Sequence, residues 1–112
     1  MNKTCWPEEF GSAITVCDKN GIILEINKKA MKTFEKYGKE LIGRSLMDCH
    51  PEPAKTKLKE MLVNPVTNIY TIEKNGIKKM IYQAPWYDNG EYAGLVEISM
   101  EIPFQMPHYC RK

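Results

Sequence analysis

The sequence predicts an α+β domain in which a five-stranded antiparallel sheet has helices packed on one of its faces. Two turn signals, Asn20-Gly21 and Asn89-Gly90, each lie between β-rich runs. Asn and Gly accept the positive φ angles that tight hairpin turns need. The residues between these two hairpins instead show apolar side chains at helical spacing. Strands grouped apart from helices in this way are typical of the α+β class.

The first third of the chain is predicted to hold a cap, a hairpin and a helix. Residues 1–11 form the short cap, and residues 13–17 and 21–26 are the two strands of the hairpin. Asn27 follows as a helix N-cap, because its side chain can accept a hydrogen bond from the first helical turn. Gly38 can end this helix. Its apolar residues at helical spacing are Ala30, Met31, Phe34 and Tyr37.

The second half of the chain is predicted to hold one helix and three strands. Residues 39–48 form short turns, and residues 49–53 break the chain because two prolines restrict the residues before them. A longer helix begins at Pro53 and ends at Asn64-Pro65. The three strands that complete the sheet are residues 68–73, 77–87 and 92–102.

The composition fits one ordinary globular domain. The 112 residues are 43% hydrophobic and 27% charged. We assign residues 12–103 to the domain, residues 1–11 to the N-terminal cap and residues 104–112 to a C-terminal tail. The net charge is only +2 and acidic residues interrupt every group of lysines, so no nucleic-acid partner is expected.

Two further features bear on the compartment. No apolar run has the length of a membrane span, and the first residues lack the pattern of a signal peptide. The sequence therefore predicts a cytoplasmic domain without a membrane partner. The four cysteines are irregularly spaced and form no CxxC pair, which predicts free thiols in a reducing compartment.

The order of predicted elements resembles that of a PAS domain, and four stretches agree with it. The first corresponds to the opening PAS hairpin and the asparagine after it, the second precedes the long helix, the third is the last hairpin, and the fourth is the end of the domain. These stretches are residues 18–23 with Asn27, residues 41–46, residues 90–97 and residues 101–103. The word Asp48-Cys49-His50-Pro51 before a lysine-rich helix is similar to a bacterial and archaeal PAS subfamily.

This resemblance implies a fold and a mode of action. The fold is an antiparallel sheet cupped by helices, with a cavity between them. Homodimers form through the outer face of the sheet or through the N-terminal cap. Signals pass when cavity occupancy or redox state changes the packing of the sheet against its flanking helices.

His50 is the first candidate for a binding residue. Two prolines flank its segment and hold the imidazole on a defined backbone, which suits a hydrogen bond inside a pocket or an axial haem ligand. PAS haem domains usually carry the ligand inside the long helix, whereas His50 lies just before it. The alternative is a half-exposed histidine that caps the following helix.

Four residues of the later strands are candidates for a cavity wall. Alternation places Met80, Tyr82 and Trp86 on one face, which we expect to be the helix-facing one, and Tyr70 lies on the preceding strand. Tyr82 and Trp86 carry polar ends that seek a partner when buried. The alternative is that these residues are simply core. Glu97 falls on the opposite face from its neighbours, where it is either solvated or part of a dimer seam.

The sequence does not identify a cofactor. Photosensing PAS domains bond a flavin through a cysteine directly after Gly-Arg-Asn, but here Leu46 follows Gly43-Arg44-Ser45, so a flavin adduct is not expected. Cys49 is then a small buried residue. His108 and Cys110 give too few ligands for a zinc site.

No catalytic motif is present, so an enzyme is not expected. Two functions remain. The first is a sensory domain that binds a small ligand in the cavity and signals through a homodimer or a partner protein. The alternative is a ligand-free module for protein interaction or dimerisation.

Overall fold

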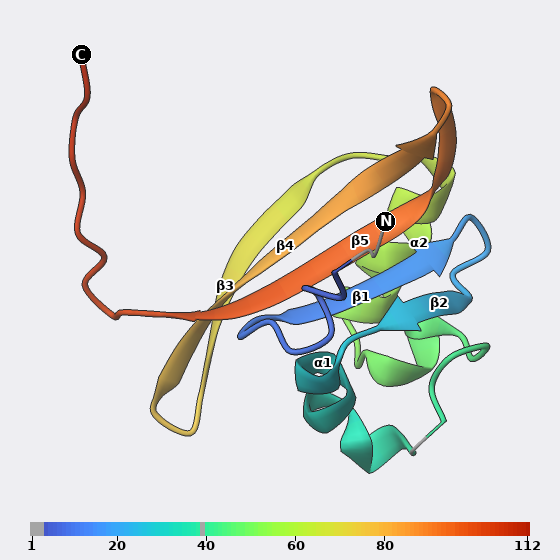
Figure 1. The fold of residues 1–112 in the computed structure, drawn as a ribbon, viewed down its shortest axis with the longest axis horizontal. Helices are drawn as coiled ribbons and strands as arrows, with labels where there is room; N and C mark the ends of the chain where they lie inside the picture. Colours follow the sequence, from blue (N-terminus) through green and yellow to red (C-terminus); the bar gives the residue numbers. More distant parts are fainter. Residues whose placement is uncertain (1–3, 39) are drawn as a thin grey trace.

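A computed structural model describes residues 4–38 and 40–112 and contains a five-stranded antiparallel sheet with the strand order β2-β1-β5-β4-β3. Met1 to Lys3 of the predicted cap and Lys39 of the predicted turns lie outside these residues. β1 and β2 form one hairpin, and β3, β4 and β5 form an antiparallel meander that brings β5 beside β1 at the centre of the sheet (Figure 1). Their bounds are β1 Ala13–Asp18, β2 Ile23–Ile26, β3 Asn68–Lys74, β4 Ile77–Asp88 and β5 Glu91–Ile102.

The helices between β2 and β3 cover one face of the sheet (Figure 1). The α-helices are α1, Lys28–Thr33, and α2, Ala54–Val63. The short 3-10 turns are η1, Glu35–Tyr37, and η2, Leu46–Cys49. The predicted α+β fold is therefore confirmed, although the first helix tightens into a 3-10 turn before Gly38. Across the described residues, no helix has the length and apolar character needed to cross a membrane.

Asn27 fixes the junction between the first hairpin and α1. Its Oδ1 accepts hydrogen bonds from the backbone N–H groups of Ala30 and Ile14, at 3.0 and 2.9 Å. Its Nδ2 donates to the carbonyl oxygens of Pro7 and Ser12, at 2.8 and 2.9 Å. The buried amide therefore caps the helix as predicted and also ties the N-terminal segment to the start of β1.

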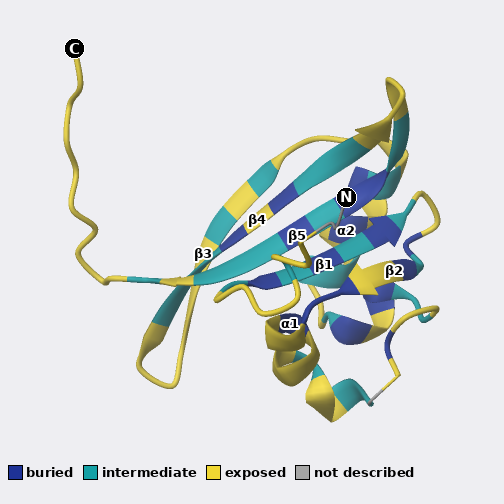
Figure 2. Cartoon of the chain, viewed as in Figure 1, coloured by how far each residue is buried: buried dark blue, intermediate teal, exposed yellow. Residues whose placement is uncertain are grey.

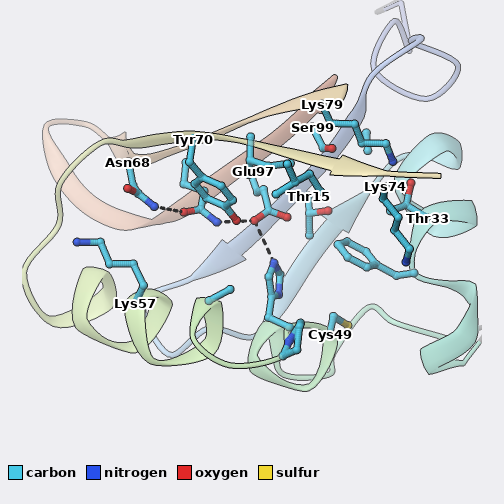
Figure 3. Close-up of a pocket in the computed structure, with 18 of the residues that line it drawn as sticks. Thr15, Thr33, Cys49, Lys57, Asn68, Tyr70, Lys74, Lys79, Glu97 and Ser99 are labelled. Atoms are coloured by element: carbon cyan, nitrogen blue, oxygen red, sulfur yellow. Dashed lines mark hydrogen bonds and ion pairs between the residues drawn. The ribbon is translucent and has the colours of Figure 1, made fainter. Parts of the chain in front are cut away.

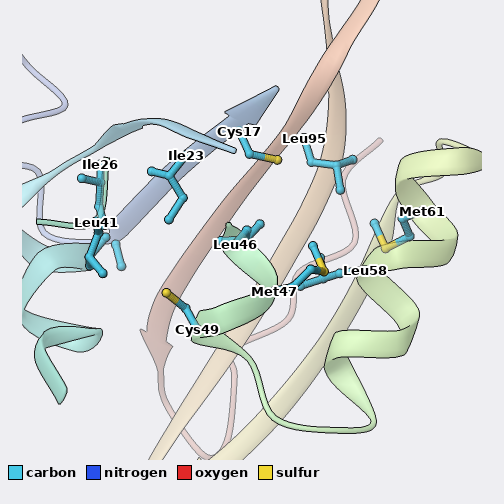
Figure 4. Packing of buried hydrophobic residues seen from close by; sticks show 12 residues of the cluster. Cys17, Ile23, Ile26, Leu41, Leu46, Met47, Cys49, Leu58, Met61 and Leu95 are labelled. Carbon is cyan, nitrogen blue, oxygen red and sulfur yellow. The ribbon is translucent and has the colours of Figure 1, made fainter. Parts of the chain in front are cut away.

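The hydrophobic core occupies the half of the domain where β1, β2 and the start of β5 meet η2 and α2 (Figure 4). Ile23, Leu46, Leu58 and Met61 are almost fully buried there. Close packing of these aliphatic side chains supplies most of the apolar burial in this half. The other half of the sheet, towards the β3–β4 hairpin, is less tightly covered and carries more exposed residues (Figure 2).

The two faces of the sheet differ from the prediction. On β4 the helix-facing residues are Ile81 and Gln83, both buried, whereas Met80, Tyr82 and Trp86 point to the outer face. The outer position of Tyr82, which is 37% exposed, follows from its pairing with Ile98 and Ile69. The expectation that this apolar set faces the helices is wrong. The predicted alternation along β4 is correct, but the two faces were assigned the wrong way round. The face that meets the helices carries the polar residue Gln83.

Gly94 on β5 allows β5 to pack closely against β1 at the centre of the sheet. It has a φ of 151°, and a Cβ atom at this position would overlap the carbonyl oxygen of Cys17 on β1. The Trp86 indole N–H reaches across and donates to that same carbonyl at 3.0 Å. A side chain at Gly94 would therefore separate β1 from β5 and break the contact made by Trp86.

We expect Gly94→Ala to destabilise the fold by at least about 2 kcal/mol, because the added methyl group meets fixed backbone and the glycine φ is strained for alanine. Gly11→Ala is the matched control, since nothing lies within 4 Å of its Cβ position. Urea denaturation of both variants measures the effect. Equal stabilities of the two variants would contradict this account of Gly94.

Candidate functional site: a polar cavity between sheet and helices

A cavity of about 670 Å³ lies between the sheet and the helical segments (Figure 3). The sheet provides one wall, with Thr15, Tyr70, Gln83, Glu97 and Ser99 among its lining residues. The opposite wall comes from the end of α1, from η1, from the connection around His50 and from the start of α2. Several lining residues are exposed, so the cavity reaches the surface. Its size suits a small organic molecule.

A continuous chain of hydrogen bonds crosses the floor of this cavity. Asn68 Nδ2 donates to Gln83 Oε1 at 2.9 Å, and Gln83 Nε2 donates to Glu97 Oε2 at 2.6 Å. His50 Nε2 lies 3.1 Å from the same Glu97 oxygen. The chain joins β3, β4 and β5 to the connection before α2 (Figure 3).

The backbone positions His50 at the end of η2. Its Nδ1 lies 3.0 Å from the carbonyl oxygen of Leu46, which can only accept, so Nδ1 carries a proton. The Phe34 ring lies 5.7 Å from the imidazole, centroid to centroid, and shields it from solvent. The side chains of His50 and Glu97 are only 8% and 7% exposed. Both ring nitrogens therefore face acceptors, and two acceptors favour the doubly protonated imidazolium.

The pKa of His50 reflects two opposed effects. Burial lowers it by disfavouring the charged ring, but the hydrogen bond to Glu97, the charge of Glu97 and the Leu46 carbonyl together outweigh burial. The pKa is consequently raised above the ordinary value of 6.5. This shift favours an imidazolium–carboxylate pair inside the domain, where an unpaired charge would be costly.

The Glu97 carboxylate on the cavity wall has an acceptor oxygen that no described residue uses. Glu97 Oε2 receives the bonds from both His50 and Gln83, whereas Oε1 receives none from any described residue. Oε1 is not sealed from solvent, since every fully buried side-chain polar atom in the described part of the chain has a partner. A bound molecule with a hydroxyl or N–H group can therefore donate to Oε1 from inside the cavity.

The structure brings together some of the predicted site residues and separates others. His50 and Tyr70 both line the cavity. Met80, Tyr82 and Trp86 lie on the far side of the sheet, away from it. The correction has the same cause as the wrong face assignment, since alternation moves all even-numbered residues of β4 together.

Sequence reasoning missed three residues of the site. Glu97 was expected to be solvated or at a dimer seam, but it is 6% exposed and faces the helices. Gln83 and Asn68, which complete the series of hydrogen bonds, were not among the predicted site residues. The available signal was the presence of Gln83 within the otherwise apolar and aromatic stretch 80–86, and of Glu97 within the similar stretch 92–98. The strands pair these residues directly, and buried polar residues of this kind require each other as partners.

The geometry does not favour metal or haem binding. Both ring nitrogens of His50 are engaged, so neither is free to ligate a haem iron. In the described ranges no three His, Cys, Asp or Glu side chains gather as metal ligands, and His108 meets only Cys110, with Nε2 and Sγ 3.8 Å apart. Cys49 is buried, and burial raises the pKa of its thiol, which disfavours the reactive thiolate.

The family of the chain follows from comparison with known proteins. Helices cupped over an antiparallel sheet with this strand order, around a cavity with a polar floor, place the chain in the class of small α+β domains. The family described as PAS fold matches residues 8–68, more than half of the chain. The chain belongs to the PAS family. A search of curated proteins finds no match.

Solved structures share the fold at low sequence identity. The PAS domain of Bordetella pertussis BvgS has a TM-score of 0.65 at 18% identity, covering 87% of this chain and 81% of that chain. A sensory box sensor histidine kinase from Vibrio cholerae has a TM-score of 0.64 at 14% identity, with 86% of each chain covered. The Aer2 receptor from Vibrio cholerae, described as a dual PAS-heme oxygen sensor, has a TM-score of 0.56 at 20% identity. The match covers 82% of this chain and 95% of that chain.

We expect His50 to titrate above pH 6.5 in the folded protein and below it in Glu97→Gln, where burial is no longer opposed by a carboxylate. Proton NMR of the imidazole resonances measures both values. The second histidine, His108, lies exposed in the tail, and its imidazole resonance serves as the chemical-shift reference. An unchanged His50 pKa in the variant would contradict the pairing.

The same pairing predicts how stability depends on pH. Because the folded-state pKa is raised, the contribution of the pair is complete below about pH 6.5 and is lost as pH rises through the folded value. Each unit of pKa difference corresponds to about 1.4 kcal/mol. The wild-type free energy of unfolding should therefore fall as the pH rises above about 6.5, and His50→Gln should remove this fall.

Proposed function

We propose that the chain is a sensory module that binds a small ligand in its cavity and reports occupancy through a homodimer or a partner protein. The single observation that carries this proposal is the cavity of about 670 Å³ whose floor is a buried chain of polar side chains. A pocket with apolar walls and a few fixed polar groups is the usual form of a small-molecule site. The proteins that share the fold include a sensor histidine kinase and a haem oxygen sensor, which supports a sensory role.

A route from the cavity to the opposite face of the sheet follows from the position of Glu97. Its side chain points into the cavity, whereas Val96 and Ile98, its neighbours on β5, point to the outer face. A ligand that forms a hydrogen bond with Glu97, or that displaces His50 from it, would change the position of β5 relative to the segment that carries His50. Partners bound on the outer face would then respond to the ligand, because both contacts act on one strand.

Haem is not the ligand we propose. The Aer2 receptor is described as a haem oxygen sensor, but here a histidine ligand would have to give up its bond to Glu97 and leave that carboxylate buried with one partner fewer. We propose an organic ligand held by hydrogen bonds, with His50 and Tyr70 among the contacting residues.

Native mass spectrometry of the purified protein should detect a co-purified small molecule, and His50→Ala should weaken its binding by about 1–3 kcal/mol through loss of a buried hydrogen-bonded group. His108→Ala, which changes the exposed histidine, is the matched control and should leave affinity unchanged. Calorimetry measures both. The same affinity for His50→Ala as for the control would count against the site.

A second candidate function is a ligand-free interaction module. The observation that favours it is the apolar outer face of the sheet, where Ile69 is 54% and Tyr82 is 37% exposed. Trp6 and Phe10 of the N-terminal segment are also exposed, at 63% and 48%. Exposed apolar surface of this kind is typical of a contact site between protein chains. Met80 and Trp86 belong to the same face.

We expect sedimentation to find a homodimer at high micromolar concentration. Tyr82→Lys should shift the equilibrium to monomer by placing a charge in the apolar contact. Val63→Lys is the matched control, since Val63 is 78% exposed on α2 at the other side of the domain. Deletion of residues 1–11 tests the share of Trp6 and Phe10. A wild-type protein that stays monomeric would exclude the dimer.

A further inference from the structure

We propose that the ligand of the cavity is an amphipathic organic anion with an apolar body, a negative group held by Lys36, Lys74 and Lys79 at one mouth, and a donor group directed to Glu97. This inference rests on the proposed function, because it specifies the chemistry of the molecule in that same cavity. We refer to the three lysines as the lysine mouth.

The lysine mouth is built by separate parts of the chain. Lys74 ends β3 and Lys79 lies on β4 beyond the Asn75-Gly76 turn, whereas Lys36 comes from η1 on the opposite wall. Figure 3 shows the ammonium groups of Lys74 and Lys79 at the same end of the cavity, near Thr33. Lys57 also lines the cavity but lies at the other end, beside Asn68.

The charges of the lysine mouth are not neutralised by the protein. Glu101 lies opposite Lys79 in the sheet, yet among the described residues no carboxylate comes within 4.0 Å of these three ammonium groups. Among the described residues, the acidic side chains that line the cavity are Glu52 and Glu97. Glu97 is paired with His50, and Glu52 accepts bonds from Thr56 at the surface. The cavity therefore has a surplus of positive charge at its rim.

The interior of the cavity favours different chemical groups on a ligand than the lysine mouth does. The wall of the interior is apolar and aromatic, with side chains from Phe34, Tyr37, Ile72 and Ile81. Burying a charged group against such a wall would cost free energy, because the group would lose its water. Deeper in, Glu97 Oε1 is an acceptor without a donor from any described residue. A molecule that fits all three regions has an apolar body, a donor such as a hydroxyl or N–H, and an anionic end.

A matched pair of fluorescent dyes tests this chemistry. The anion 8-anilinonaphthalene-1-sulfonate carries an apolar body, an N–H donor and a sulfonate, and N-phenyl-1-naphthylamine is the same body without the sulfonate. We expect the anion to bind about tenfold more tightly at low salt, since several partly exposed lysines each contribute a few-fold. Its affinity should fall as ionic strength rises, and that of the neutral dye should not.

Variants locate the source of this preference. Lys74→Gln combined with Lys79→Gln should remove most of the preference for the anion and its salt dependence. Lys59→Gln combined with Lys78→Gln is the matched control, because it removes the same charge but neither residue lines the cavity. Equal loss in both double variants would overturn the lysine mouth, since it would show a general charge effect.

A blocked cavity separates this inference from the proposed function. Ala54→Trp places an indole in the cavity wall and should abolish binding of both dyes, with Ser99→Phe as a second blocking variant if the first fails to fold. If blocking abolishes both but the dyes bind equally to wild type, the cavity stands and the anion inference is overturned. Unchanged binding in both folded blocking variants places the dyes on another surface and counts against the proposed function itself. If neither dye binds, the anion inference is overturned, and native mass spectrometry alone decides the proposed function.

Discussion

The burial of one carboxylate, that of Glu97, constrains the rest of this domain. A charge at the centre of a sheet is costly unless it is paired and hydrogen-bonded. His50 and Gln83 both bond the same oxygen of Glu97, and Asn68 holds Gln83 in turn. Three strands and the connection before α2 must therefore keep their relative positions for the charge to remain satisfied. The polar floor of the cavity and its position in the sheet follow from this requirement.

The same constraint divides the domain into two halves with different tasks. Aliphatic packing around Leu46, Leu58 and Met61 is nearly complete in one half and supplies stability (Figure 4). In the other half, polar side chains and the long β3–β4 hairpin leave a cavity unfilled. The aliphatic core and the cavity floor are thus built largely from different residues, so residues of the cavity floor can vary without loss of the core.

The sheet also has two unlike faces. Its inner face holds buried polar groups at Thr15, Gln83 and Glu97, and its outer face carries an apolar series that includes Tyr82 and Ile98. A strand such as β5 contributes alternate residues to each. One strand therefore borders both the cavity and the outer face, which is the physical basis of the signalling route proposed above.

The sequence by itself determined the elements and their order, because their signals are local. Asn27 caps α1 through its own next turn, and the Asn75-Gly76 and Asn89-Gly90 turns have the positive φ angles that their residue types favour. Only the tertiary structure decided which face of β4 meets the helices. Alternation defines two faces but does not label them, and the apolar set containing Tyr82 gave the wrong choice. The polar residues Gln83 and Glu97 are stable inside only because the fold brings His50, distant in sequence, within hydrogen-bonding reach.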